Sequence, residues 1–176
     1  MINELIKILS PPQDRNFDET LLTAFEAKES LMLPEDFKEI ISVYGGGLVD
    51  DFICILDPTS SNGSLNFEKS KYFQDTYTSM QQEFPSDYPR PRHPAKNSFL
   101  PWAVTNNGET FVWIIDGDVN AWKTAIHSVD QGDEELYSCG CLELLLKILL
   151  REIKSAILPS QFPSIDSSYH HFEPAT

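Results

Sequence analysis

The sequence predicts a single α+β domain, in which a twisted, mainly antiparallel sheet of short strands packs against N-terminal helices and a long C-terminal helix. Three patterns predict this class: helical apolar spacing before residue 45, β-rich runs with Asn/Asp-Gly turns over 100–129, and a leucine-rich stretch after residue 138. The chain has 176 residues, the size of one domain. We expect residues 1–158 to form this domain and residues 159–176, rich in Ser and Pro, to be a loosely attached tail.

The first 47 residues are predicted to be mainly helical. Residues 4–9 form a short apolar run, and the apolar residues of 17–25 fall near helical spacing on one face. Pro34 suits the first position of a further helix over 35–44, because its missing N–H costs nothing there. The triplet Gly45-Gly46-Gly47 then ends this helix.

The middle of the chain combines a strand, a weak helix and a proline-rich loop. Residues 52–56 are a short apolar run closed by Asp57-Pro58, which is typical of a buried strand. Residues 66–83 have weak helical spacing. The loop Pro85–Pro101 holds the basic cluster of the chain, which consists of Arg90, Arg92, His93 and Lys96.

Three short strands are predicted after this loop. Residues 100–105, 110–115 and 121–129 are rich in β-forming residues. The turns Asn106-Asn107-Gly108 and Asp116-Gly117-Asp118 connect them, and such tight turns join antiparallel neighbours. The pattern therefore predicts an antiparallel meander.

An acidic loop and a long helix are the last predicted elements. Residues 130–135 contain four acidic side chains and read as a loop. Residues 138–158 have leucine and isoleucine over much of the helical circumference. We therefore expect this helix to be largely buried against the sheet.

The net charge indicates which classes of partner the protein can bind. With 13 basic and 27 acidic side chains the net charge is −14, which repels phosphate backbones and attracts basic partners. Direct nucleic-acid binding is therefore not expected. Taken alone, the charge is better explained by solubility than by a basic partner. No run approaches the ~20 apolar residues that span a bilayer, and the first residues do not resemble a signal peptide. We expect no membrane contact and a cytoplasmic location.

No catalytic, metal or cofactor site is predicted. The three cysteines fit neither a zinc site nor a disulfide framework, which indicates a reducing compartment. Residues 116–120 resemble the start of a calcium loop, but Ala121 and His127 stand where Gly and Glu are required. The four histidines lie in no recognisable catalytic motif. We expect a binding module that needs no cofactor.

Two stretches carry a more specific combination. Residues 33–47 read LPEDFKEIISVYGGG, with Leu-Pro before an amphipathic helix, then an aromatic residue and a Gly-x-Gly turn. Residues 99–113 read FLPWAVTNNGETFVW, with Pro and Trp before a polar-Gly turn and an aromatic-rich strand. In this order the stretches resemble the SUKH superfamily, a group of immunity proteins that includes a yeast regulator of cell-wall synthesis. The resemblance covers about residues 21–158.

The resemblance gives the motif residues structural roles. Leucine and proline set the entry to the helix, glycines allow the turns, and the tryptophans pack the sheet against the helices. The residues expected to define the fold are Leu33, Pro34, Gly45, Gly47, Pro101, Trp102, Gly108, Trp113 and Trp122.

The resemblance also implies a non-enzymatic immunity protein that neutralises a cognate toxin, often a nuclease. A nuclease has a basic substrate cleft, and carboxylates of an acidic protein can occupy it in place of phosphates. The expected contact residues are Asp50, Asp51, Asp116, Asp118, Asp130, Asp133, Glu134 and Glu135.

Two other functions stay open. A regulatory scaffold could dock on a host protein through the proline-rich loop 85–101, with its basic residues and PxxP element as a linear motif. An enzyme of unknown chemistry is the third hypothesis. The sequence leaves open whether the protein is a monomer or a weak dimer.

Overall fold

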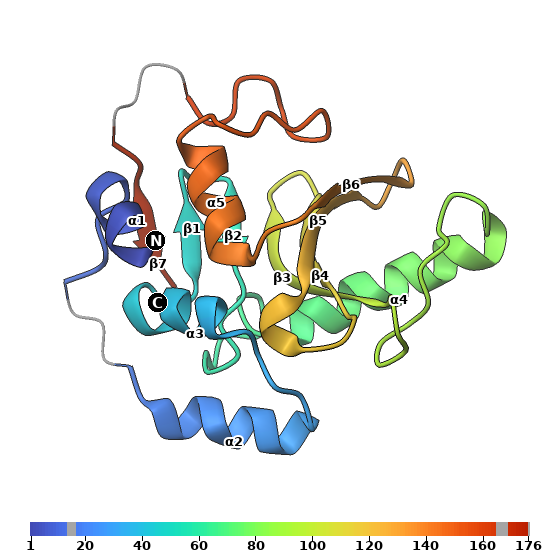
Figure 1. Ribbon diagram of the computed structural model, residues 1–176, viewed down its shortest axis with the longest axis horizontal. Helices are drawn as coiled ribbons and strands as arrows, with labels where there is room; N and C mark the ends of the chain where they lie inside the picture. Colours follow the sequence, from blue (N-terminus) through green and yellow to red (C-terminus); the bar gives the residue numbers. More distant parts are fainter. Residues whose placement is uncertain (14–16, 165–168, 176) are drawn as a thin grey trace.

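The protein has a seven-stranded sheet in which every strand is antiparallel to its neighbours. A computed structural model describes residues 1–13, 17–164 and 169–175, and the strand order is β6-β5-β4-β3-β2-β1-β7 (Figure 1). The strands are β1 (Gly47–Val49), β2 (Ile53–Ile55), β3 (Phe99–Thr105), β4 (Thr110–Ile114), β5 (Lys123–Ser128), β6 (Asp133–Tyr137) and β7 (Phe172–Pro174).

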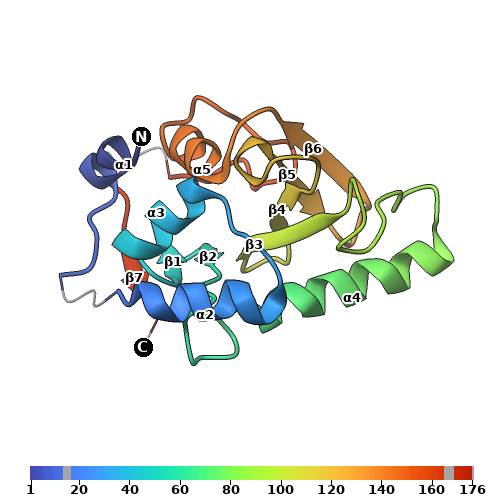
Figure 2. The same ribbon diagram turned by 60° about the horizontal axis from the view of Figure 1, so that its bottom comes forward.

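Helices cover both faces of this sheet. The helices of the described residues are α1 (Ile2–Ile8), α2 (Glu19–Glu29), α3 (Glu35–Val43), α4 (Glu68–Glu83) and α5 (Cys141–Leu149). The main apolar core includes residues of α1, α3 and α5 on one face, whereas α4 packs on the opposite face of β3, β4 and β5 (Figures 1 and 2). The predicted α+β class and the antiparallel sheet are confirmed.

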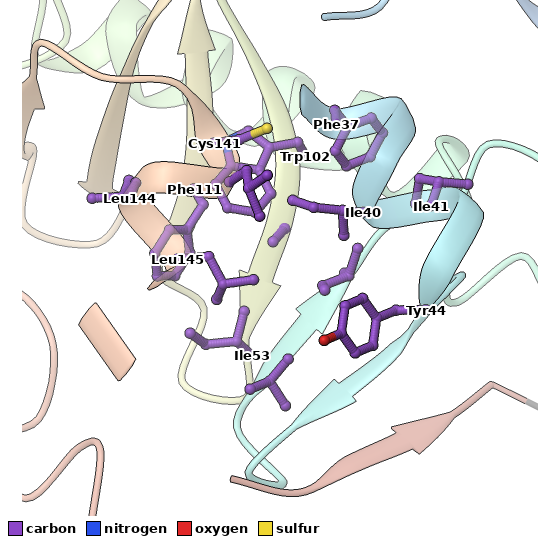
Figure 3. Packing of buried hydrophobic residues seen from close by; sticks show 14 of the residues in the cluster. Phe37, Ile40, Ile41, Tyr44, Ile53, Trp102, Phe111, Cys141, Leu144 and Leu145 are labelled. Carbon is purple, nitrogen blue, oxygen red and sulfur yellow. The ribbon is translucent and has the colours of Figure 1, made fainter. Parts of the chain in front are cut away.

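Aromatic side chains join α3 to the centre of the sheet. Trp102 on β3 and Trp113 on β4 are fully buried, and Trp122 lies in the same core. The ring of Phe37 on α3 lies edge-on to Trp113, with 4.8 Å between ring centroids. Figure 3 shows α3 and α5 inserting apolar side chains toward Trp102 and Phe111. Such edge-to-face pairs add about 0.5–1.5 kcal/mol to the burial itself.

The glycine triplet after α3 allows a close approach of three chain segments. Gly45 has a φ of +73°, in the left-handed region that favours glycine. The Gly46 N–H donates to Asp57 Oδ2 at 3.1 Å, which ties the turn to the end of β2. Gly47 lies directly against Phe172 of β7 and has no room for a side chain.

The prediction of one long C-terminal helix over 138–158 is wrong, because α5 ends at Leu149. Arg151 adopts a left-handed φ of +60°. Its N–H donates to the Ile148 carbonyl at 2.9 Å, and the Glu152 N–H donates to the Lys147 carbonyl at 2.8 Å. These two bonds form a Schellman motif, which satisfies the last helical carbonyls. Glycine usually marks this position, and arginine gives no such signal.

The predicted acidic loop 130–135 is also wrong in its second half. Residues from Asp133 onward form β6, which adds a fourth strand to the meander and pairs antiparallel with β5. Glu134 is the register partner of His127. Charged side chains are typical of an edge strand, since they discourage pairing with other chains. The acidic composition therefore led to the prediction of a loop where the structure has a strand.

The C-terminal segment is attached to the sheet rather than loose. Residues of β7 pair with β1 as its outer neighbour. His170 Nδ1 lies 2.6 Å from Asp50 Oδ2, and its Nε2 lies 3.1 Å from the carbonyl oxygen of Leu149 at the end of α5. One side chain thus joins this segment to both the β1–β2 turn and α5. The division of the chain at residue 158 stays a prediction.

We predict that Gly47→Ala destabilises the protein by about 1–3 kcal/mol, the usual cost of overpacking. A Cβ at this position would lie 2.6 Å from Phe172 Cζ, so β7 must move away from β1. Urea unfolding measures the loss, and amide hydrogen exchange shows whether β7 opens first.

Gly63→Ala is the matched control, because a Cβ there meets no atom within 4 Å. The control should keep wild-type stability. A Gly47→Ala protein as stable as the control would contradict the close packing of β7.

Candidate partner-binding surface

The eight acids predicted to contact a partner lie in several places and differ in what they already bind. Asp50 and Asp51 form the β1–β2 turn, where both have positive φ. Asp50 accepts from the His171 N–H at 2.8 Å in addition to its contact with His170. Burial raises the pKa of Asp50, but these hydrogen bonds outweigh burial and the pKa is lowered. Asp50 therefore holds the C-terminal segment, whereas Asp51 is exposed.

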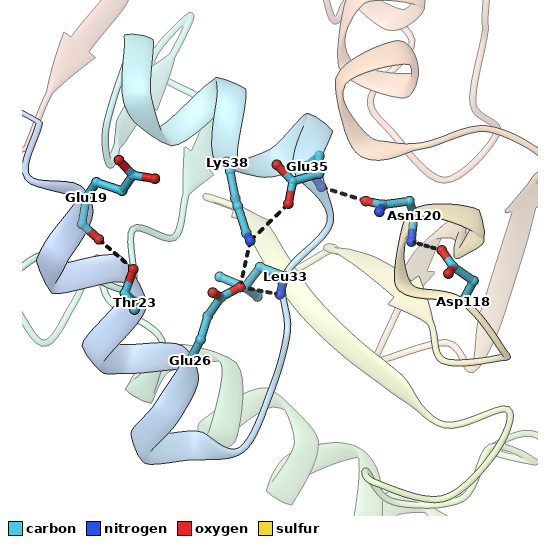
Figure 4. Close-up of polar contacts among 8 residues, drawn as sticks. All are labelled: Glu19, Thr23, Glu26, Leu33, Glu35, Lys38, Asp118 and Asn120. Atoms are coloured by element: carbon cyan, nitrogen blue, oxygen red, sulfur yellow. Dashed lines mark hydrogen bonds and ion pairs between the residues drawn. The ribbon is translucent and has the colours of Figure 1, made fainter.

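Asp118 is used within the fold. It accepts from the Asn120 N–H at 2.9 Å, and Asn120 Oδ1 in turn accepts from the Glu35 N–H at the start of α3 (Figure 4). Helix starts have free N–H groups, so this relay caps α3. Asp116 pairs with Lys96 at 3.1 Å.

A carboxylate of α2 contacts the segment that leads into α3. Glu26 on α2 accepts from the Leu33 N–H at 2.8 Å and pairs with Lys38 at 3.0 Å (Figure 4). The Leu33-Pro34 motif is therefore held between α2 and α3. These acids therefore already have partners within the fold.

Glu135 also makes hydrogen bonds within the protein. Its carboxylate accepts from Tyr137 Oη and from the Ala156 N–H, both at 2.7 Å. Burial raises the pKa of Glu135, but hydrogen bonds from Ser155, Tyr137 and Ala156 outweigh burial and the pKa is lowered. Glu135 thus attaches the segment after α5 to the edge of the sheet.

Glu134 joins the proline-rich loop to β6 and β5. Arg90 donates to both carboxylate oxygens of Glu134 in a bidentate pair, and His127 Nε2 lies 2.6 Å from Oε2. The Arg90 Nη1 also donates to the Asn97 carbonyl at 3.2 Å. Burial raises the pKa of Glu134, but its hydrogen bonds with Arg90 and His127 outweigh burial and lower the pKa to about 2. We call Arg90, Glu134 and His127 the loop clamp.

His127 is the buried member of the loop clamp. His127 is 2% exposed, and its ring stacks on Tyr77 of α4 with 5.8 Å between ring centroids. Burial lowers the pKa of His127, so the ring is neutral at pH 7 and its Nε2–H donates to the Glu134 carboxylate. Nδ1 is then an acceptor, and it has no hydrogen-bond partner among the described residues. Sequence patterns gave no signal for this cluster, since its members come from three separate segments.

Three exposed acids beside the loop clamp have no ion pair with any described residue. Asp130 lies in the β5–β6 turn, and Asp133 is the first residue of β6. Asp87, which the sequence did not single out, comes from the proline-rich loop. We call Asp87, Asp130 and Asp133 the acidic rim.

Close packing fixes the acidic rim. Gly132 has a φ of +73°, and a Cβ there would lie 3.0 Å from Asp87 Cβ, so the turn and the loop touch. Tyr88 Oη donates to the Val129 carbonyl, which joins the same two segments from the other side. These two neutral contacts thus join the segments that carry the three carboxylates of the acidic rim.

Two hollows lie along α4 on either side of the β5–β6 turn. The first has a volume of about 370 Å³ and is lined by Tyr77, Ser86, Asp87, Pro89, His127, Ser128, Gln131, Gly132, Asp133 and Glu134. The second has a volume of about 590 Å³ and includes Phe73, Tyr72, Val104 and Asp130 in its wall. The acidic rim therefore borders both hollows.

The basic cluster of the proline-rich loop is largely paired within the protein. Arg90 belongs to the loop clamp, Arg92 pairs with Asp75 of α4 at 2.6 Å, and Lys96 pairs with Asp116. Burial lowers the pKa of His93, which favours its neutral form. The loop presents little free positive charge.

No group of metal-binding side chains occurs among the described residues. The three cysteines are free thiols, and burial raises the pKa of Cys54 to about 11. None of the helices in residues 1–13, 17–164 and 169–175 has the length and apolar character of a membrane span.

Comparison with known proteins identifies one family. A family model described as SMI1-KNR4 cell-wall, from the SUKH group, matches residues 19–139. The match runs from the start of α2 to the residues before α5, so it includes α4, the proline-rich loop and the acidic rim. No curated protein and no solved structure matches the chain.

We predict that Glu134→Gln lowers the free energy of unfolding at pH 7 by about 1 kcal/mol, because Arg90 loses its counter-charge and the pair is partly screened by solvent. The lowered pKa of Glu134 means that wild type has this stabilisation in full above about pH 4.5 and loses it as the pH falls toward about 2. The difference between the two proteins should shrink over this interval. Urea unfolding at a series of pH values measures it.

Glu39→Gln removes an exposed carboxylate of α3 and is the control. It should unfold like wild type at every pH. A Glu134→Gln deficit that did not change between pH 7 and pH 3 would mean that the charge of Glu134 is not what stabilises the clamp.

Proposed function

The chain belongs to the SMI1-KNR4 family of the SUKH superfamily, and we propose that it is a non-enzymatic immunity protein that binds and neutralises a cognate protein toxin. Members of this superfamily are generally associated with immunity and therefore with a protein partner. The proposal places the protein in the cytoplasm of the cell that makes the toxin. It requires a surface that recognises the toxin without chemistry of its own.

The acidic rim is the observation that carries this proposal. Asp87, Asp130 and Asp133 are exposed and have no described cation beside them, unlike Asp50, Asp116 and Glu134. An unpaired carboxylate binds a positive charge of a partner at a small cost in free energy, because no ion pair within the protein has to break. A toxin with a basic surface, such as a nuclease, supplies that charge.

The whole-protein charge supports rapid association with such a toxin. A net charge of −14 attracts a basic protein over a distance of about 10 Å at moderate salt. This attraction raises the association rate, whereas local contacts at the rim set the dissociation rate. Neutralisation of a toxin before it acts benefits from both.

The scaffold hypothesis, in which the proline-rich loop acts as a linear motif, draws less support from these contacts. Arg90, Arg92 and Lys96 bind acids of the same chain, and Tyr88 of the loop is buried. A linear motif has to leave its own fold to bind. The toxin hypothesis uses the folded surface as it stands.

We predict that the double variant Asp130→Lys/Asp133→Lys binds the toxin about 100-fold more weakly than wild type, since like charges across an interface cost several kcal/mol. The full chain is co-expressed with an inactivated form of the product of the neighbouring gene. Affinity is then measured over a salt series by calorimetry.

Glu39→Lys/Glu152→Lys makes the same change in net charge away from the rim and is the matched control. Both control residues are exposed, on α3 and just after α5. The control should lose only the long-range, salt-dependent part of the association rate. Equal losses in both double variants would remove the rim from the interface, and an absence of complex with wild type would overturn the proposed function.

A further inference from the structure

The second hollow has an apolar floor made by the first three strands. It is lined by Leu48 of β1, Cys54 of β2 and Val104 of β3, together with Phe73 of α4. Cys54 and Val104 belong to a small buried cluster, against which Leu48 and Phe73 pack. Because α4 runs away from β1 and β2 (Figure 1), Leu48 and Phe73 are only half-buried and stay open to the hollow.

An exposed aromatic side chain lies beside this floor. Tyr72 of α4 lines the same hollow and is 59% exposed, and its ring lies edge-on to Phe73 with 5.4 Å between ring centroids. Tyrosine often dominates the binding energy of a protein interface, because it buries a large ring and keeps a polar end. A group that enters the hollow can therefore reach the Tyr72 ring, whereas the ring of Tyr77 is buried.

Two residues of opposite charge complete the lining. Lys69 Nζ lies 5.3 Å from the centroid of the Tyr72 ring and 5.8 Å from that of Phe73, and it has no ion pair with any described residue. Burial raises the pKa of Cys54, and the Lys69 ammonium opposes this rise, so the ammonium lies near the floor. Asp130 of the acidic rim lines the hollow from the β5–β6 turn.

Lys69 and Asp130 lie at opposite ends of the hollow. α4 lines it from Lys69 to Thr76, whereas the next residue, Tyr77, already lines the first hollow on the other side of the β5–β6 turn. Asp130 is therefore at the Thr76 end. An α-helix rises 1.5 Å per residue, so this wall is about 10 Å long. An extended peptide advances about 3.3 Å per residue, so three residues with their side chains can span it.

We infer that the second hollow receives one large apolar side chain from an extended segment of the partner, an inference that rests on the proposed function. The segment carries a basic residue on the Asp130 side of this side chain and an acidic residue on the Lys69 side. Burial of the apolar side chain on the floor provides affinity. The two charged ends fix the orientation of the segment and disfavour one that is basic throughout.

The acidic rim and the second hollow share Asp130. A partner whose basic residue binds Asp130 therefore brings the next residues of its chain to the apolar floor. A volume of about 590 Å³ accommodates an aromatic side chain together with its neighbours.

The test uses three capped tripeptides and the full chain labelled with ¹⁵N. Lys-Trp-Glu has the inferred pattern, Lys-Ser-Glu lacks the apolar side chain, and Lys-Trp-Lys carries more positive charge. General attraction to a net charge of −14 favours Lys-Trp-Lys, whereas the hollow favours Lys-Trp-Glu.

The peptides are compared at about 0.3 M salt, which screens long-range attraction. Lys-Trp-Glu should give saturable amide shifts centred on Leu48, Phe73 and Asn107, and Lys-Ser-Glu should not bind. Lys-Trp-Glu should bind about threefold more tightly than Lys-Trp-Lys, the usual size of one exposed ion pair.

Single variants locate the binding. Tyr72→Ala should weaken Lys-Trp-Glu about tenfold, as loss of an aromatic contact at an interface often does. Phe84→Ala is the matched control, because Phe84 is also a large exposed aromatic residue but follows the end of α4, away from the hollow. Its affinity should change less than about twofold, as is usual for a surface substitution. Lys69→Gln should abolish the preference for Lys-Trp-Glu over Lys-Trp-Lys.

Four outcomes would overturn the inference: no binding of Lys-Trp-Glu, equal binding of Lys-Ser-Glu, tighter binding of Lys-Trp-Lys, or an equal loss in Tyr72→Ala and Phe84→Ala. Toxin affinity is measured separately with the same variants. A chain that binds the toxin equally well with and without Tyr72 loses the apolar contact and keeps the proposed function. A chain that binds the peptides as expected but not the toxin loses the proposed function alone.

Discussion

The pairing of Glu134 with Arg90 and His127 is the contact on which the position of the proline-rich loop against the sheet depends. It connects the proline-rich loop to the last two strands of the meander, and the hydrogen bond from Tyr88 Oη to the Val129 carbonyl joins the same segments. A half-buried carboxylate without partners would carry a large desolvation cost. The bidentate guanidinium removes that cost and also sets the distance between loop and turn. Gly132 and Tyr88 then complete a rigid support for the rim.

The strong net charge of the protein has two distinct uses. Asp50, Asp118, Glu134 and Glu135 hold segments of the chain in place through hydrogen bonds or ion pairs. Asp87, Asp130 and Asp133 make no such ion pair with any described residue. Composition alone cannot separate these groups, because the difference lies in which cations and N–H groups the fold brings near each carboxylate. The prediction that these acids contact a partner therefore stays open, and the structure adds which of them are already bound within the protein.

Local patterns were sufficient where a single segment determines its own structure. The helix after Pro34, the weak helix over 66–83 and the strands around the Asn-Gly turn all follow from periodicity and turn residues, and the structure contains each of them. The failures come from contacts between distant segments. β6 pairs with β5, and its Glu134 meets Arg90 and His127 from other segments, whereas α5 stops where Arg151 adopts a left-handed conformation. The loop clamp and Asp87 lay beyond prediction for the same reason.

Rigidity of the acidic rim affects recognition as well as stability. Three carboxylates on separate mobile segments would repel one another and spread apart, and a partner would have to bring them together at an entropic cost. Here neutral contacts made by Gly132 and Tyr88 join the segments that carry them before any partner arrives. The repulsion that remains between them is relieved when a cation binds. Preorganisation and relieved repulsion therefore act in the same direction, and both favour a partner that presents positive charge at one defined position over one that is merely basic overall.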